Sequence, residues 1–310
     1  MMKFAATSSF VVLCAGFALS QTLPASLVDT AGSLWPHWDK NHDGKLDRRE
    51  IVTTLRNPAV RGLDATIAAN LYQNRYLFSD AAKPFFVTRE EMLALAAEPG
   101  FAKSVQRGLA RLARTSSTLF AEGDPKLTGF HQGRAGDCYL LSNLAMLVLQ
   151  RPELIRAMYT TLGNGDIRVT LGDGQTATVS PMTDGEVLLG ADTGAGSGVW
   201  LPVFEKAYGL IRQQEAERAA AKNPKGVPHA LANRYDEEMY SVLISSGASV
   251  ATLQELTGHK VIGDAVLFGK EASEQQKKLE ETHALLVRLM RRSGSSSCTP
   301  GGIQTKAPGL

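Results

Sequence analysis

Residues 39–50 place side chains that can donate oxygen ligands at regular spacing. The positions are Asp39, Asn41, Asp43, Lys45, Asp47 and Glu50. Lys45 offers its backbone carbonyl, Asp47 acts directly or through water, and Glu50 offers both carboxylate oxygens. Because Ca²⁺ takes roughly six to eight hard oxygen ligands, this set has the composition of a calcium site. Gly44 permits the sharp turn that the site needs, since it has no side chain to clash in a left-handed backbone.

The same residues match an EF-hand calcium loop at every ligand position. Leu46 is the apolar residue that would pair with a partner loop. The alternative, an acidic surface turn, does not account for six matched positions between two helical segments. A second loop, residues 80–91, resembles an EF-hand only near its end, where Glu91 takes the last ligand position. Its other positions depart from the pattern at Ala82, Pro84 and Phe85. We expect this second loop to be a structural partner and not a calcium site.

Cys138 opens an apolar stretch of helical length, residues 138–149. A cysteine at the start of a helix lies in the positive field of the helix N-terminus, which favours the thiolate form. Gly133 and Gly136 allow the backbone to approach a substrate closely, and a side-chain amide six residues upstream can point at a developing oxyanion. The alternative is a buried structural cysteine, since cysteine is among the most buried residue types.

Residues 132–142 read Gln-Gly-Arg-Ala-Gly-Asp-Cys-Tyr-Leu-Leu-Ser and resemble the active-site segment of calpain-family cysteine proteases. The resemblance implies that Cys138 is the nucleophile, forming a thioester, and that Gln132 is an oxyanion donor beside the Cys138 backbone N–H. Residues 198–208 and 253–258 resemble two later segments of the same family, in family order. The resemblance therefore covers about residues 132–310 and is most specific in its first half.

A thiolate protease needs a histidine base oriented by an asparagine. The family's Gly-His-Ala-Tyr-type strand and Asn-Pro-Trp-Gly-type turn are absent from this sequence, and residues 298–310 resemble the segment just before that strand. We expect a truncated chain of an active enzyme, with a degenerate inactive protein as the alternative. His283 has a faint similarity to the family pattern but falls in a helical stretch, residues 274–292. Zinc is unsupported, because neither Cys-x-x-Cys nor His-Glu-x-x-His occurs.

The N-terminus predicts export. Lys3 precedes an apolar core at residues 10–19, and small residues lead to a cleavage point before Gln21. This core is shorter than the roughly 20 residues that span a bilayer, so no membrane span is expected after removal of the signal. We expect a secreted, periplasmic or cell-envelope protein. Cys138 and Cys298 then remain and could form one disulfide. A net charge of +2 argues against nucleic acid as a partner.

These observations predict an α+β fold. It consists of a mostly helical, EF-hand-like N-terminal region followed by the helical lobe of a papain-like calpain fold, with the second catalytic lobe missing. The expected boundaries are a signal peptide at 1–20, an EF-hand region at 21–100, a helix and linker at 101–128, and an incomplete protease lobe at 129–310. The helical pattern of residues 94–114 carries a basic face, which we expect to be a solvated surface. That face is formed by Lys103, Arg107, Arg111 and Arg114.

The function expected from this sequence is that of a calcium-dependent cysteine endopeptidase acting on protein or peptide substrates. The competing class is a non-catalytic secreted calcium-binding protein that keeps a degenerate protease scaffold. A third hypothesis is a calcium-stabilised envelope protein in which Cys138 and Cys298 are disulfide-linked.

Overall fold

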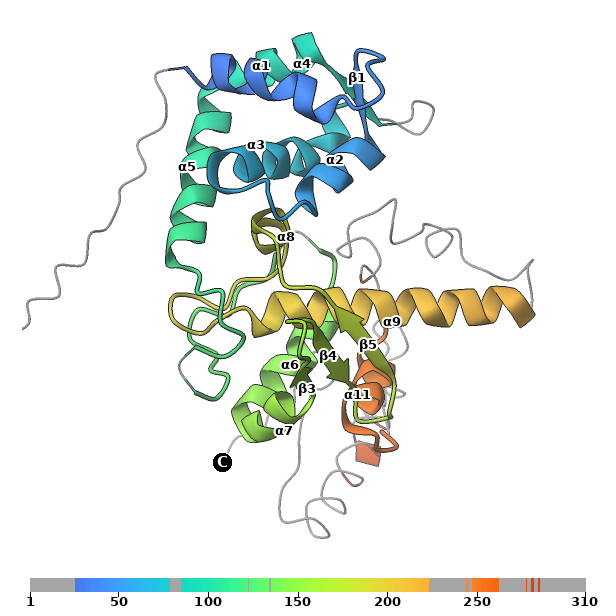
Figure 1. Cartoon of the computed structure of the whole chain (residues 1–310). Coiled ribbons are helices and arrows are strands. Elements are labelled where there is room, and N and C mark those ends of the chain that lie inside the picture. Colours follow the sequence, from blue (N-terminus) through green and yellow to red (C-terminus); the bar gives the residue numbers. More distant parts are fainter. Residues whose placement is uncertain are drawn as a thin grey trace, which may run out of the picture.

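The computed structural model describes residues 26–78, 85–121, 123–133, 135–222, 244 and 247–261, together with residues 277, 280, 281 and 284. It is a mostly helical α+β structure with two small antiparallel sheets (Figure 1), which confirms the predicted class. The predicted signal peptide, Cys298 and most of the predicted helix at 274–292 lie outside the described residues. Among the described helices, none combines the length and the apolar character that crossing a membrane requires.

The N-terminal unit contains two successive helix–loop–helix segments. The first comprises α1 (Leu27–Trp38), β1 (Lys45–Asp47) and α2 (Arg48–Leu55). The second comprises α3 (Gly62–Gln73), η1 (Arg75–Leu77), β2 (Phe86–Thr88) and α4 (Arg89–Ala97). Their loops meet in the antiparallel pair β1–β2, where Leu46 stands opposite Val87 and both side chains are fully buried. The predicted pairing of Leu46 with a partner loop is confirmed.

The helices that follow the two loops, α2 and α4, begin with the same reciprocal capping pair. In α2 the Asp47 side chain accepts from the Glu50 backbone N–H, and the Glu50 carboxylate accepts from the Asp47 N–H. Thr88 and Glu91 make the same reciprocal pair at the start of α4. Each pair satisfies N–H groups that the first turn of a helix leaves without partners. Helix α2 ends at Leu55 and α3 begins at Gly62, with Pro58 in the segment between them.

Two helices join this unit to the rest of the chain. Helix α5 (Pro99–Arg114) packs against both α3 and α8 (Asp184–Leu189). Figure 1 shows α8 between the N-terminal helices and the long helix α9 (Trp200–Lys222). The hydroxyl of Thr183, the N-cap of α8, donates to the carbonyl of Leu55 at 2.6 Å. The start of α8 is therefore anchored on the end of α2, the helix that follows the first loop.

The C-terminal region packs helices on a three-stranded sheet. Its elements are α6 (Cys138–Gln150), α7 (Pro152–Ala157), β3 (Tyr159–Thr161), β4 (Ile167–Thr170), β5 (Thr176–Val179) and α11 (Ser249–Thr257). The sheet order is β3-β4-β5, and Ile167 pairs with Val179 in the β4–β5 hairpin. Helix α9 lies on β4 and β5, while α6 packs against α11.

A buried ion pair connects α8 to α9. The ammonium of Lys206 lies 2.8 Å from a carboxylate oxygen of Glu186, and the two side chains are only 5% and 1% exposed. Lys206 also donates to the carbonyl and hydroxyl oxygens of Ser180. A buried charge without such partners would be strongly destabilising, so the pair fixes how α8 lies on α9.

The tight contact between α8 and α2 predicts that Gly185→Ala destabilises the protein. A Cβ at Gly185 would lie 2.5 Å from the Leu55 carbonyl oxygen, which is backbone and cannot swing aside. We expect a loss of about 1–3 kcal/mol in the free energy of unfolding, measured by urea denaturation. Gly100→Ala is the matched control, since Gly100 is also the second residue of its helix and a Cβ there meets nothing within 4 Å. Equal urea midpoints for the two variants would contradict the proposed contact.

Candidate functional site

In the predicted calcium loop, ligand side chains accept hydrogen bonds from the backbone of the same loop. Asp39 Oδ2 accepts from the Gly44 N–H at 3.1 Å. Asn41 Oδ1 accepts from the Asp43 N–H at 3.0 Å, and Asp43 Oδ1 accepts from the Lys45 N–H at 2.9 Å. Gly44 has a φ of 77°, as expected for the turn. The loop is therefore wound so that its acidic and amide side chains face its own backbone.

The Glu50 carboxylate closes the loop on itself. Its Oε1 accepts from the N–H groups of Lys40 and Asn41, at 2.8 and 3.3 Å, and its Oε2 accepts from the Asp47 N–H at 3.1 Å. Asp39 is buried, and its Oδ1 accepts from no donor in the part of the chain that the structure describes. An anionic oxygen buried without a partner is costly, so it is a position that a cation would satisfy.

The donor set fits Ca²⁺. The carboxylates of Asp39, Asp43 and Glu50, the Asn41 amide oxygen and the Lys45 carbonyl are the hard oxygens that calcium prefers. In the described part of the chain, however, no three His, Cys, Asp or Glu side chains already converge as a metal-binding group. Bidentate coordination by Glu50 would replace its present hydrogen bonds to backbone amides.

The second loop contains no comparable arrangement in its described part. Phe85 is buried at the position of the turn glycine, and the carboxylate of Glu91 caps α4 through the Thr88 N–H. The other two departures from the motif, Ala82 and Pro84, lie outside the described residues.

Cys138 carries a free, exposed thiol at the first position of α6. The alternative of a buried structural cysteine is therefore wrong. The helix behind the thiol is fixed: the Tyr139 hydroxyl donates to the Ile244 carbonyl at 2.8 Å, and the Asn143 amide donates to the Ser249 carbonyl at 2.9 Å. An exposed sulfur at the start of a helix that is packed into the core is accessible to a substrate, as a nucleophile must be.

The exposed side chain of Gln132 folds back onto the loop that leads to Cys138. Its Nε2 donates to the Ala135 carbonyl at 2.7 Å and to Asp137 Oδ1 at 3.2 Å. The amide nitrogen has two hydrogens, and these two contacts employ both. Donation to an oxyanion would require Gln132 to exchange one of them.

The described histidines do not contact Cys138. His37, His42, His131 and His259 are all exposed, and no hydrogen bond joins any of these four to the thiol. His131 instead pairs through its backbone with Asp192, at 2.8 Å in both directions. His229 and His283 lie outside the described residues.

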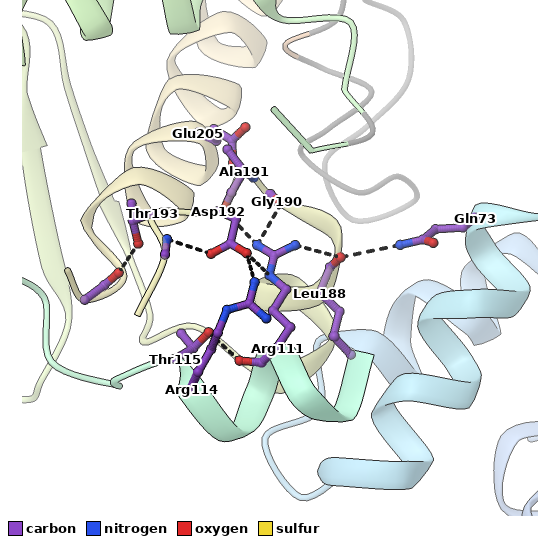
Figure 2. Close-up of polar contacts among 12 residues, drawn as sticks. Gln73, Arg111, Arg114, Thr115, Leu188, Gly190, Ala191, Asp192, Thr193 and Glu205 are labelled. Atoms are coloured by element: carbon purple, nitrogen blue, oxygen red, sulfur yellow. Dashed lines mark hydrogen bonds and ion pairs between the residues drawn. The ribbon is translucent and has the colours of Figure 1, made fainter. Parts of the chain in front are cut away.

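Arg111 of α5 caps the end of α8, as Figure 2 shows. Its guanidinium donates to the carbonyls of Gly190 and Ala191 at 2.9 and 2.8 Å, and to that of Leu188 at 3.4 Å. Its side chain is only 16% exposed, so the expectation of a solvated basic face is wrong for Arg111. The spacing of basic residues gave no signal for this role, because Lys103 and Arg107 share the pattern and are exposed.

Asp192 continues the same network. Its carboxylate pairs with the guanidinium groups of Arg111 and Arg114, and it accepts from the Gly194 N–H at 2.9 Å (Figure 2). Carboxylate and guanidinium groups form strong, directional charge-assisted bonds. The segment after α8 is therefore held by a helix of the N-terminal half of the chain.

Residues 190–194 in turn support the loop before Cys138. A Cβ on Gly133 would lie 2.7 Å from the backbone of Gly190, and one on Gly129 would lie 2.6 Å from the Cα of Gly194. Between these two contacts stands the His131–Asp192 backbone pair. A side chain at Gly133 would therefore meet Gly190, so this packing contact by itself requires a glycine. The predicted close approach of a substrate to the backbone at Gly133 stays a prediction.

Behind Cys138, two buried carboxyl groups face each other. Asp137 and Glu205 of α9 are both 0% exposed and lie within hydrogen-bonding contact of each other. Burial, and then the neighbouring Asp137, raise the pKa of Glu205 well above its ordinary value. Burial also raises the pKa of Asp137. In the sequence Glu205 stands out only as part of a segment resembling the calpain family, so its buried partner could not be inferred.

We compared the chain with protein-family models, curated proteins and solved structures, and none of them matched. The proposed roles of the site residues therefore depend only on their positions and contacts in this structure.

The network around α8 predicts that Arg111→Ala lowers stability. The change removes charge-assisted bonds and leaves buried carbonyls without donors, so we expect a loss of about 2–3 kcal/mol in the free energy of unfolding. Urea denaturation followed by circular dichroism measures it. Arg107→Ala on the same helix is the control and should change stability by less than about 0.5 kcal/mol. If both variants behaved alike, Arg111 would not be the cap of α8.

Proposed function

We propose that the protein is a calcium-binding cysteine endopeptidase of the calpain type, acting on protein or peptide substrates through Cys138. The observation that carries the proposal is the exposed, free thiol of Cys138 at the first residue of a mostly buried helix. The loop before it presents an amide, Gln132, at the spacing of the family motif. In this proposal the C-terminal region is the helical lobe of a papain-like fold, and the N-terminal unit is an EF-hand pair with one calcium site at residues 39–50.

The chemistry would proceed by acyl transfer. The thiolate of Cys138 attacks the substrate carbonyl, the C–N bond breaks, and the amine leaves with a proton supplied by a general acid. Water then hydrolyses the thioester and restores the thiol. The oxyanion would be stabilised by the Cys138 backbone N–H and by the Gln132 amide. Gln132 would have to give up one of its hydrogen bonds, to Ala135 or to Asp137, in order to donate to the oxyanion. The acid–base group in such a mechanism is a histidine, and the described histidines do not contact Cys138.

The second candidate is a non-catalytic calcium-binding protein that retains a protease-like scaffold. Two observations favour it. The amide of Gln132 is engaged by Ala135 and Asp137, and no hydrogen bond joins Cys138 to a described histidine. A Cys138–Cys298 disulfide, the third hypothesis, does not agree with the free thiol at Cys138. Export by the N-terminal signal, to the outside of the cell or to its envelope, is part of both remaining proposals.

Calcium would act through the junction between the two halves of the chain. Glu50, a proposed ligand, is in the first turn of α2, and the last residue of α2, Leu55, accepts the hydrogen bond from Thr183. Ordering the loop would therefore stabilise α2 and the contact that anchors α8. Whether it also changes the reactivity of Cys138 is measurable.

The endopeptidase proposal predicts fast alkylation of Cys138 near pH 6. A cysteine nucleophile reacts as the thiolate, so an endopeptidase Cys138 should react with iodoacetamide faster than the Cys298 reference in the same chain. Cys138→Ser should lower peptide hydrolysis by at least about a thousandfold. Both rates are measured with calcium and with chelator. Labelling of Cys138 no faster than Cys298, with no hydrolysis, would instead support the non-catalytic binding protein.

The calcium proposal predicts that Ca²⁺ stabilises the folded chain through Glu50. At a free calcium concentration roughly tenfold above its Kd, the free energy of unfolding should rise by about 1.4 kcal/mol. Glu50→Gln should abolish this rise, because it removes a bidentate anionic ligand. Glu91→Gln is the matched control, since Glu91 caps α4 as Glu50 caps α2. Equal calcium responses in the two variants would place the ion elsewhere.

A further inference from the structure

We propose that Asp137 and Glu205 share a single proton, and that this carboxyl pair is a positioning element for Gln132 and the loop that carries Cys138. The positioning role deepens the proposed function and rests on it. The shared proton is a property of the buried pair and does not depend on that function.

Both carboxyl groups of the pair are buried. Neither residue has any exposed surface, and the two side chains lie within hydrogen-bonding contact of each other. Asp137 Oδ2 and Glu205 Oε1 are both buried, and neither accepts from an N–H or O–H donor among the described residues. Two carboxylates in contact cannot both be ionised at low cost, since like charges repel strongly away from water. One proton converts the contact into an O–H···O⁻ hydrogen bond.

The charged and titratable groups around the pair also bear on its ionisation. The guanidinium of Arg111 acts on Glu205 electrostatically, but it also donates to carbonyls at the end of α8 and pairs with Asp192. The other titratable groups that face the pair are Tyr139, on the side of Asp137, and Tyr159, on the side of Glu205. Burial raises the pKa of both tyrosines, so neither supplies a positive charge. Among the described residues, the pair therefore has no cation devoted to it alone that would balance two negative charges.

The other oxygen of each carboxyl group accepts a hydrogen bond from a neighbouring N–H group. Asp137 Oδ1 accepts from the Gln132 amide at 3.2 Å, and Glu205 Oε2 accepts from the Ala191 N–H at 2.7 Å. Ala191 in turn belongs to the segment that Arg111 caps. A continuous series of hydrogen bonds therefore runs from α5 through residue 191 and the carboxyl pair to Gln132, six residues before the thiol.

The shared proton gives the stability of the protein a definite dependence on pH. The pKa of Glu205 is raised in the folded state, so the folded chain keeps a proton that the unfolded chain has lost. The stabilisation is complete below the ordinary pKa of a glutamate and is lost as the pH rises toward the folded-state pKa. Across that window the unfolding equilibrium constant should rise by up to tenfold per pH unit.

The test uses Glu205→Gln in the full chain. Glutamine keeps the volume, accepts from Ala191 and can donate to Asp137 without a titrating proton. Relative to the wild type, the variant should lose the rise of the unfolding constant that begins above the ordinary pKa of a glutamate, about pH 4.3. Glu217→Gln on the same helix is the control, because Glu217 is exposed, and it should keep the wild-type slope.

Two further readouts use the folded protein. Difference infrared spectroscopy should show an un-ionised carboxyl group at neutral pH in the wild type and its loss in Glu205→Gln. The NMR signals of the Gln132 side-chain amide should titrate with the pair in the wild type and stay constant in the variant. An equal pH slope in both proteins, with no un-ionised carboxyl signal, would overturn the shared proton. A Gln132 amide insensitive to the pair would overturn the positioning role.

If Glu205→Gln fails to fold, Asp137→Asn removes the other carboxyl group and should abolish the same infrared signal. The outcome is separable from the proposed function. An un-ionised carboxyl signal without peptide hydrolysis would support the pair and refute the endopeptidase, whereas hydrolysis without that signal would do the reverse.

Discussion

The guanidinium group of Arg111 holds together two halves of the chain that are distant in sequence. A helix leaves the carbonyls of its last turn without partners, and α8 is too short to bury them by itself. Arg111 donates to the carbonyls of Leu188, Gly190 and Ala191, and Gln73 of α3 reaches the first of these. Because a guanidinium is planar and always charged, one side chain can satisfy several acceptors at once. The path of the backbone from α8 to α9 depends on this contact.

That path supports the candidate nucleophile. Residues 190–194 pack against residues 129–133, and glycines lie at the closest approaches. The Ala191 N–H donates to the carboxyl group of Glu205. Glu205 faces Asp137, the residue before Cys138. The thiol thus lies at the exposed end of a series of buried polar contacts. Such a series is stable only when each member is satisfied, which is why a proton between the two carboxyl groups accounts for their burial.

The predicted calcium loop is connected to the same series from the other side. Its last ligand position, Glu50, caps α2, and α2 ends at the carbonyl that accepts from Thr183. Thr183 starts α8, and the buried pair of Lys206 with Glu186 fixes α8 on α9. A short helix is thus held at its start by the calcium-loop unit and at its end by Arg111. Through this arrangement, calcium bound at the proposed site would stabilise the contacts that hold α8 on the C-terminal region.

The sequence by itself determined the elements whose signals are local. The helix from Cys138 depends on neighbours a few residues apart, and the pairing of Leu46 follows from the position of this apolar residue in its own loop. Only the tertiary structure decided that Arg111 is a cap, that Gly133 faces Gly190 and that Asp137 meets Glu205. Each joins residues about 60 to 80 positions apart, at sites where the sequence carries an ordinary arginine, glycine or carboxylate. Burial gives those groups their roles, and no local pattern encodes burial between distant segments.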